Sequence, residues 1–145
     1  MFNRILIVCL GNICRSPTAE RIMRARLHQK DGVEISSAGL TAVVGHPVDG
    51  VAADVLLSHG ISPEEHVAHQ LTQELALRSD LILTMEKSYL QEIHRLAPAA
   101  QGRVFLLGKW LGDVEIPDPY RRSREMYDSV YQQIDRAVSG WIPYI

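Results

Sequence analysis

Two cysteines and an arginine lie close together near the start of the chain. Cys9, Cys14 and Arg15 fall within seven residues, and no other cysteine occurs in the sequence. A thiolate is a strong nucleophile, and the planar guanidinium of an arginine can hold two phosphate oxygens at once. A cysteine followed six positions later by an arginine therefore indicates nucleophilic attack on a phosphate ester. In this interpretation Cys9 is the nucleophile and Arg15 binds the phosphate.

The residues between and beside them are suited to hold an anion. Gly11 lets the chain turn closely, and Asn12 tolerates left-handed backbone angles. The pair Ser16-Pro17 predicts the start of a helix, with Ser16 as its capping residue. Successive N–H groups that curve into a helix N-terminus bind tetrahedral anions. We therefore predict that this loop binds the phosphate through Leu10, Gly11, Asn12, Ile13, Cys14 and Ser16.

Other uses of the two cysteines fit less well. A disulfide between Cys9 and Cys14 would close too short a loop to add much stability, and two cysteines without a neighbouring ligand make a poor zinc site. We expect neither a metal ion nor a cofactor. Cys14 is either a small packed residue or a thiol that traps oxidised Cys9 as a reversible disulfide.

Asp118 is an acidic residue in the segment before the last predicted helix. It lies between two prolines, Pro117 and Pro119, which fix the backbone of the loop. Judged on these residues alone, however, an aspartate followed by proline is more often an ordinary turn residue.

Alternating strands and helices must position these residues. The continuous apolar run at 4–10 is typical of a strand covered on both faces. Further strands are predicted at 33–37, 80–85 and 103–107, and helices at 16–29, 49–59, 72–78, 86–96 and 123–141. Asp49 is expected to cap the second helix and Gly60 to end it. This alternation predicts an α/β fold with a four-stranded parallel, doubly wound sheet and helices on both faces. Ligands of such sheets bind beyond the carboxyl ends of the strands, where the loop after the first strand lies.

Two amphipathic patterns carry further expectations. The apolar side chains of the last helix recur every three or four residues, and this stripe is expected to lie on the sheet. Its residues are Met126, Val130, Ile134, Ala137 and Trp141. Residues 1–30 hold six basic side chains against Glu20 alone, which favours an anionic ligand. Arg21, Arg24 and Arg26 are interpreted as the solvated face of a helix.

The composition narrows the class of protein. The chain has 145 residues, a formal net charge of −2 and 46% hydrophobic residues. We expect one domain spanning residues 1–145, with no nucleic-acid partner and no membrane insertion, since no apolar run approaches the length of a membrane helix. The N-terminus lacks the pattern of a signal peptide, so we expect a cytoplasmic protein. The sequence does not indicate an oligomeric state.

The sequence VCLGNICRSP, which contains Cys9 and Arg15, resembles the signature of the low-molecular-weight protein tyrosine phosphatases. The resemblance extends along the chain, through Ser36–Gly39, His66–Ala68, Asp80–Met85 and Ile116–Tyr120. The stretch Leu107–Ser123, together with Met85-Glu86-Lys87, is most similar to bacterial members encoded with capsule and exopolysaccharide export systems. His69 departs from the family pattern, because many members have arginine there.

The resemblance implies hydrolysis of phosphotyrosine through a phosphocysteine intermediate, with Cys9, Arg15 and Asp118 as the catalytic residues. Asp118 then acts as general acid, which reverses the interpretation made from the residues alone. Ser16 stabilises the cysteine thiolate, and Ser37 and His66, with Asn12, hold the loop in shape. Leu40 and Tyr120 form the two walls of the substrate crevice. The implied partner is a phosphotyrosine protein, with an autophosphorylating bacterial tyrosine kinase as the candidate.

Three other functions share parts of this pattern. Thioredoxin-coupled arsenate reductases use the same loop but relay electrons through further cysteines, which this chain lacks. A sugar-transport phosphocarrier also phosphorylates a loop cysteine, but Arg15 and an acid suited to hydrolysis argue against a stable phosphocysteine. A phosphotyrosine-binding module without activity would not need the nucleophile, the arginine and the acid together.

Overall fold

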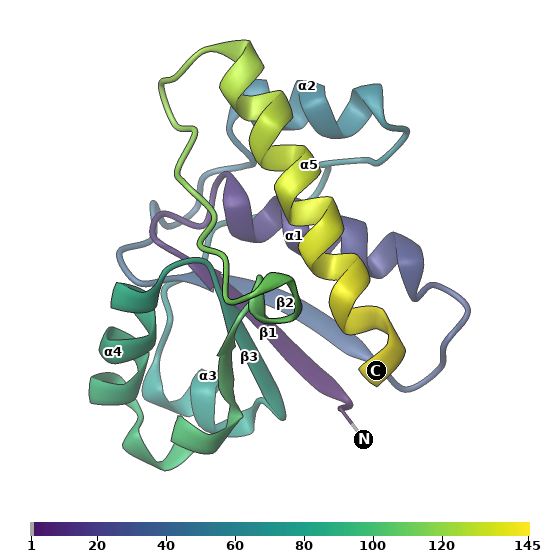
Figure 1. Cartoon of the computed structure of the whole chain (residues 1–145). Helices are drawn as coiled ribbons and strands as arrows, with labels where there is room; N and C mark the ends of the chain where they lie inside the picture. The colour runs from purple at the N-terminus through teal and green to yellow at the C-terminus, as the bar shows by residue number, and fades with distance from the viewer. Residues whose placement is uncertain (1) are drawn as a thin grey trace.

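The computed structural model describes residues 2–145, and its centre is a parallel β-sheet (Figure 1). The strands stand in the order β2-β1-β3-β4. Their bounds are β1 Arg4–Cys9, β2 Glu34–Gly39, β3 Leu81–Thr84 and β4 Val104–Leu106. β1 pairs with β2 on one side and β3 on the other, so that Cys9 lies opposite Gly39 and Val8 lies opposite Thr84. The four predicted strands and their parallel, doubly wound arrangement are confirmed, with ends that differ by a residue or two.

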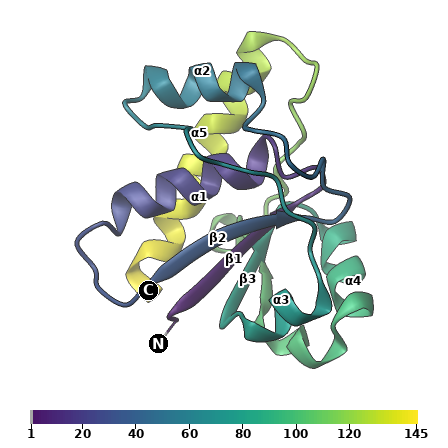
Figure 2. The same cartoon turned by 180° about the vertical axis from the view of Figure 1, so that it is seen from behind.

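Helices cover both faces of this sheet. Figures 1 and 2 show α1, α2 and α5 on one side and α3 and α4 on the other. The bounds are α1 Arg15–Arg26, α2 Gly50–Ser58, α3 Gln73–Arg78, α4 Lys87–Leu96 and α5 Arg124–Trp141. Short 3₁₀ turns η1 Pro98–Arg103, η2 Lys109–Leu111 and η3 Ile142–Tyr144 complete the elements. No helix within residues 2–145 is long and apolar enough to cross a membrane.

The alternation of β1 determines which way the nucleophile candidate points. Ile5, Ile7 and Cys9 belong to the core on the α1 and α5 side, whereas Leu6 and Val8 belong to the core on the α3 and α4 side. Successive side chains of a strand face opposite sides of the sheet. Because β1 is the interior strand between two helical layers, both of its faces are apolar. Cys9 therefore ends the strand with its thiol on the α1 side.

Most predicted helix ends agree with the structure. The side chains of Asp49, Thr72 and Ser123 accept hydrogen bonds from backbone N–H groups in the first turns of α2, α3 and α5. Gly60 follows α2 with a φ of 74°, which suits glycine. The prediction for Ser16 is wrong. Helix α1 begins at Arg15 after Cys14, without a side-chain cap, and Ser16 lies inside the first turn with its hydroxyl directed to the thiol of Cys9.

The apolar stripe of α5 is buried, but the expectation that it lies on the sheet is only partly right. Helix α5 packs most closely on α1, α2 and η2, and its side chains reach the core that α1 shares with β1 and β3. Trp141 donates a hydrogen bond to the carbonyl of Leu107. Since α1 already covers β1, α5 is held one helix further out along most of its length.

Candidate active site

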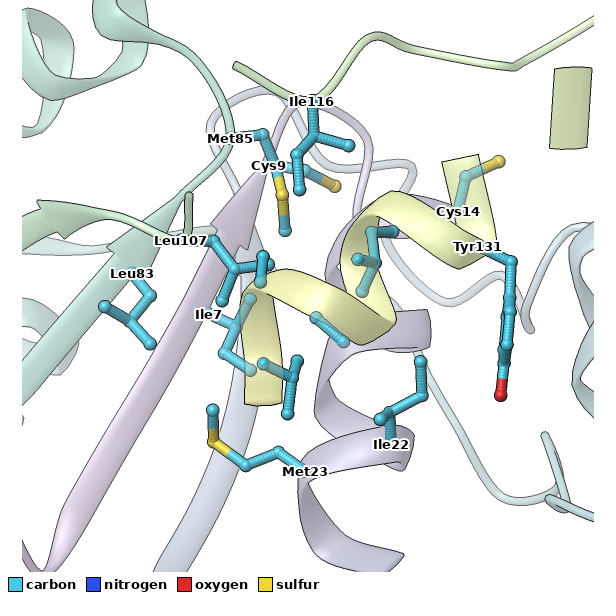
Figure 3. Packing of buried hydrophobic residues seen from close by; sticks show 14 of the residues in the cluster. Ile7, Cys9, Cys14, Ile22, Met23, Leu83, Met85, Leu107, Ile116 and Tyr131 are labelled. Atoms are coloured by element: carbon cyan, nitrogen blue, oxygen red, sulfur yellow. The ribbon is translucent and has the colours of Figure 1, made fainter. Parts of the chain in front are cut away.

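The loop after β1 surrounds the thiol of Cys9. Cys9 is buried, and its Sγ lies 2.9 Å from the Oγ of Ser16. Figure 3 shows Cys9 at the end of β1 beside Met85 and Ile116. A hydroxyl that donates to sulfur stabilises the thiolate relative to the thiol. The structure therefore brings the predicted nucleophile and Ser16 into direct contact.

Asn12, in the middle of this loop, forms side-chain hydrogen bonds to three other residues. It is fully buried and has a φ of 60°, in the left-handed region where asparagine is tolerated. Its Nδ2 donates to the Oγ of Ser16 at 2.8 Å and to the Oγ of Ser37 at 2.9 Å, and its Oδ1 accepts from the N–H of His69 at 2.9 Å. A strained backbone persists where its surroundings determine it, as these bonds do here.

His66 supports the same residue through the backbone. Its Nε2 lies 2.7 Å from the carbonyl oxygen of Asn12, so this nitrogen donates. Burial lowers the pKa of His66, although the hydrogen bond to Asn12 acts in the opposite direction. His66 is therefore neutral at neutral pH. Both Ser37 and His66 contact Asn12, where the resemblance expects them, and the backbone N–H of His69 contributes whatever its side chain is.

Glu20 is a buried residue of this network that sequence reasoning missed. It is 3% exposed, and its Oε1 accepts a hydrogen bond from the Oγ of Ser37 at 2.6 Å. Its Oε2 lies 3.2 Å from Arg24 and 3.4 Å from Arg21. Arg21 and Arg24 are therefore partners of a buried carboxylate, and not simply a solvated face. A lone acid among six basic residues was the signal that could have revealed it.

Arg15 is held by groups from three distant parts of the chain. The side chain is buried, and its Nη1 donates to Glu86 Oε2 at 2.5 Å and to the carbonyl of Ile116 at 2.9 Å. Its Nη2 donates to the hydroxyl of Tyr89 at 2.8 Å. Glu86 and Tyr89 were not predicted as site residues, because nothing in their spacing links them to the loop.

The charge of Arg15 is secure despite its burial. Burial alone would lower the pKa of Arg15, but the charge of Cys9 and the bonds to Glu86 and Tyr89 raise it above the ordinary arginine value. Burial raises the pKa of Tyr89 to about 12, although Arg15 acts to lower it. Tyr89 is therefore a neutral partner, and the positive charge of Arg15 faces the thiol of Cys9.

A cavity of about 310 Å³ opens above the loop. Asp118 and Tyr120 form one wall, and Thr41 and Val43 lie in its lining. The remaining lining comes from the loop, namely Cys9, Leu10, Gly11, Ile13, Cys14 and Arg15. Leu40, which follows β2, is partly buried and packs against the hydrophobic core, and its place on the second wall of the crevice stays a prediction.

Asp118 belongs to a turn and also lines the cavity. Its Oδ1 accepts a hydrogen bond from the N–H of Tyr120 at 3.0 Å, which is the local bond of a turn aspartate. Its Oδ2 lies 3.8 Å from Nη2 of Arg15. The side chain is 42% exposed and borders the cavity that contains Cys9. Asp118 therefore has a carboxyl oxygen available for a group bound above the thiol.

Cys14 lies in a different environment from Cys9. Both cysteines are free and buried. Burial raises the pKa of Cys14, and the charges of Asp49 and Cys9 raise it further. In Figure 3 its sulfur points away from Cys9, at the start of α1. The thiol of Cys14 is therefore protonated at neutral pH.

Within residues 2–145, no three His, Cys, Asp or Glu side chains come together in a way that could hold a metal ion. The guanidinium of Arg15 brings a positive charge to the cavity that contains Cys9. A thiol, a buried arginine and a carboxyl group converge on one cavity at the carboxyl end of a parallel sheet. This site defines a cysteine-dependent phosphatase.

The comparison with known proteins agrees with this class. A family model described as low molecular weight phosphotyrosine protein phosphatase matches residues 4–145, and the chain belongs to that family. The chain is 47% identical to the low molecular weight protein-tyrosine-phosphatase Etp of Escherichia coli K12, over 97% of this chain and 93% of Etp. The resemblance found in the sequence is confirmed, and the enzyme is a protein-tyrosine phosphatase.

Solved structures show the same fold. The crystal structure of the tyrosine phosphatase AmsI of Erwinia amylovora has a TM-score of 0.95 and 43% identity, over 100% of this chain and 94% of AmsI. Wzb of Vibrio vulnificus, in complex with benzylphosphonate, has a TM-score of 0.95 and 40% identity, over the full length of both chains.

Proposed function

We propose that this phosphatase hydrolyses phosphotyrosine on an autophosphorylated bacterial tyrosine kinase of polysaccharide export, in the cytoplasm, with Cys9, Arg15 and Asp118 as its catalytic residues. The observation that carries the catalytic part is a single cavity that is lined by Cys9, Arg15 and Asp118 together. The kinase is proposed from the similarity of Leu107–Ser123 and Met85-Glu86-Lys87 to the exopolysaccharide-associated members.

In the first step the thiolate of Cys9 attacks phosphorus. A sulfur–phosphorus bond forms, and the bond between phosphorus and the phenolic oxygen breaks. Asp118 gives its proton to the departing oxygen, so that tyrosine leaves as a neutral phenol. The transferring group carries negative charge on its three outer oxygens, and this charge is what the protein must stabilise.

Arg15 and the N–H groups of residues 10–15 supply that stabilisation. Donors already in place at the start cost little reorganisation during the reaction. Glu86, Tyr89 and the carbonyl of Ile116 hold the guanidinium of Arg15 in position. Asn12, with its bonds to Ser16, Ser37 and His69, holds the loop.

In the second step a water molecule attacks the phosphocysteine. Asp118, now deprotonated, takes a proton from the water, and the sulfur–phosphorus bond breaks to release phosphate. Cys9 leaves as a thiolate, which the hydroxyl of Ser16 stabilises from 2.9 Å. This return of the thiolate distinguishes a phosphatase from a phosphocarrier, in which the phosphocysteine persists.

The cavity walls suit an aromatic phosphate ester. Ile13 and Val43 present apolar surface, and Tyr120 adds an aromatic ring that can stack on a phenyl group. Wzb of Vibrio vulnificus forms a complex with benzylphosphonate, in which a phosphonate is joined to a benzyl group. We expect a phenyl ring to occupy the cavity above Cys9 in this protein.

The test uses purified protein and a phosphotyrosine peptide with a metal chelator present. We expect phosphate release at an undiminished rate with the chelator, no release by Cys9→Ser, and no thioredoxin-dependent reduction of arsenate. Activity that survives in Cys9→Ser would exclude the mechanism. A phosphoprotein that outlasts many turnovers would indicate the phosphocarrier instead.

A capture experiment tests the substrate. Immobilised Cys9→Ser protein retains the cavity and should bind phosphotyrosine proteins from a bacterial lysate that contains such a kinase, with the kinase among them. The double variant Cys9→Ser/Arg15→Lys is the control, because it loses the planar fork that binds phosphate. Capture of the kinase equally by both proteins would contradict the assignment of that substrate.

A further inference from the structure

The mouth of the active-site cavity has two chemically different sides. On one side Leu10 and Val43, which line the cavity, are exposed apolar residues. On the other side the chain continues from Asp118 through Tyr120 to two arginines, Arg121 and Arg122, both exposed. A substrate protein must place the residues that flank its phosphotyrosine over this rim.

A tight turn fixes the position of the two arginines. The N–H of Arg122 donates to the carbonyl of Pro119 at 2.8 Å, which closes a four-residue turn from Pro119 to Arg122. Arg121, at the third position of this turn, has a φ of 62°. Glycine or asparagine normally occupies a third position with positive φ, because other side chains are strained there. Arg121 therefore occupies a backbone conformation that glycine would adopt with less strain.

The side chain of Arg121 lies at the edge of the cavity. Its guanidinium lies over the ring of Tyr120, 5.3 Å from the ring centre, and Tyr120 borders the cavity. The stacking attracts the cation to the ring face and limits its motion. A positive charge is therefore held next to the place proposed for the phenyl ring of the substrate.

Neither arginine is neutralised within the protein. In the part of the chain that the structure describes, no carboxylate lies within 4.0 Å of the guanidinium of Arg121 or Arg122, whereas the neighbouring Arg124 pairs with Asp128 at 3.2 Å. Asp118 is directed into the cavity, and Glu115 accepts a bond from the backbone of Lys87. Two uncompensated positive charges thus flank the entrance on one side.

We propose that Arg121 and Arg122 select phosphotyrosine substrates that have acidic side chains next to the phosphotyrosine. This inference rests on the proposed phosphotyrosine phosphatase activity and specifies its substrate class. Charges at the rim of an interface chiefly change the rate of association and its dependence on salt. The selection acts on the flanking residues, because the phosphate group itself is bound by the loop and Arg15.

The experiment compares three phosphotyrosine peptides that differ only in the residues flanking the phosphotyrosine, which are Glu, Gln or Lys. We expect kcat/KM in the order Glu, Gln, Lys, with the Glu peptide favoured over the Gln peptide by roughly three- to tenfold at low salt, as exposed ion pairs allow. Salt at about 0.5 M should bring the ratio close to one, since the charges are then screened.

Variants assign the effect to the two arginines. Arg121→Gly suits the positive φ and removes the charge, and Arg122→Gln removes the second charge. Each should lower the Glu-to-Gln ratio, and the double variant should bring it close to one, whereas Arg121→Lys should retain most of it. Arg124→Gln is the matched control, because its charge is paired with Asp128, and its ratio should equal that of the unaltered protein.

Because kcat/KM for the Glu peptide is divided by kcat/KM for the Gln peptide of the same variant, a substitution that changes the activity on all peptides equally leaves this ratio unchanged. A Glu-to-Gln ratio near one in the unaltered protein, with the Gln peptide hydrolysed, would overturn this inference and leave the phosphatase activity intact. A ratio that persists in the double variant would overturn it as well. If the protein hydrolyses a small aryl phosphate but none of the three peptides, both the inference and the proposed function are overturned.

Discussion

The guanidinium of Arg15 and the carboxylate of Glu86 form an ion pair of 2.5 Å inside the active site, although 71 positions separate them in the chain. Arg15 opens α1, and Glu86 lies between β3 and α4. The two strands β1 and β3 are neighbours in the sheet, so the loops that follow them meet at the same edge. The order of the strands therefore brings Glu86 to Arg15, the residue that we propose binds the phosphate.

Glu86→Gln should lower kcat/KM for an aryl phosphate by roughly ten- to a hundredfold, because a hydrogen bond between charged groups contributes about 1.5–3 kcal/mol. Inhibition by inorganic phosphate should weaken in parallel, since the same guanidinium binds it. Steady-state kinetics and thermal unfolding of each variant check this. Glu92→Gln, at an exposed position of α4, is the control. Unchanged phosphate inhibition in Glu86→Gln would remove Glu86 from this positioning role.

Asp118→Ala should slow the hydrolysis of phosphotyrosine far more than that of an aryl phosphate with an acidic phenol. General acid catalysis contributes roughly 10²- to 10⁴-fold, and a phenolate that is already a good leaving group does not need the proton. A series of aryl phosphates of decreasing phenol pKa measures this difference. Glu125→Gln, an exposed acid in the first turn of α5, is the control. Equal losses across the series would show that Asp118 is not the acid.

Ser16→Ala should slow the second chemical step more than the first. The hydroxyl of Ser16 lies 2.9 Å from the sulfur of Cys9 and stabilises it as a leaving thiolate. Rapid mixing should then show a burst of phenol, followed by a slower steady state in which phosphocysteine accumulates. Ser139→Ala, at an exposed position of α5, is the control. A variant with a lower rate but no burst would contradict this role.

The pH dependence of stability should contain a contribution from His66. The pKa of an unfolded histidine is about 6.5, and burial lowers the pKa of His66 in the folded protein. Below pH about 6.5 the unfolded state therefore binds more protons than the folded state, and stability falls as pH falls through this range. Denaturant unfolding at several pH values should show a smaller decrease for His66→Gln than for the unaltered protein. His28→Gln, at an exposed position, should retain the full decrease.

The two cysteines should differ in reactivity. Burial and the nearby charges of Asp49 and Cys9 raise the pKa of Cys14, whereas Cys9 lies beside the positive charge of Arg15. Iodoacetate at neutral pH should therefore modify Cys9 faster than Cys14, because the protonated thiol of Cys14 is a poor nucleophile. Peptide mass spectrometry measures the modified fraction of each residue. Faster modification of Cys14 would contradict the arrangement described.

Local patterns were sufficient to predict the strands and helices and to single out the loop after β1 as the proposed phosphate-binding loop. The apolar run before Cys9 and the Ser16-Pro17 pair mark a strand and a helix, and a parallel α/β sheet brings the loop between them to its binding edge. Adjacency in the sequence does not say which group a side chain contacts. The cap predicted at Ser16 failed for this reason: its hydroxyl is bonded to Cys9 and Asn12 instead.

The class of enzyme, and Cys9 and Arg15 as the proposed nucleophile and phosphate-binding residue, could be inferred from the order of the residues alone, because both residues lie in one continuous loop whose chemistry is local. The distant side chains that hold this loop in place could not be predicted from the sequence. Glu86 and Tyr89, which follow β3, form hydrogen bonds with Arg15, which follows β1. Glu20 of α1 accepts a hydrogen bond from Ser37. The guanidinium of Arg121 stacks on the ring of Tyr120 at the rim of the cavity. Such contacts depend on which strands are neighbours and on which face of a helix is buried. Only the packed tertiary structure decides these, because burial and pairing of charges are properties of distant segments brought together.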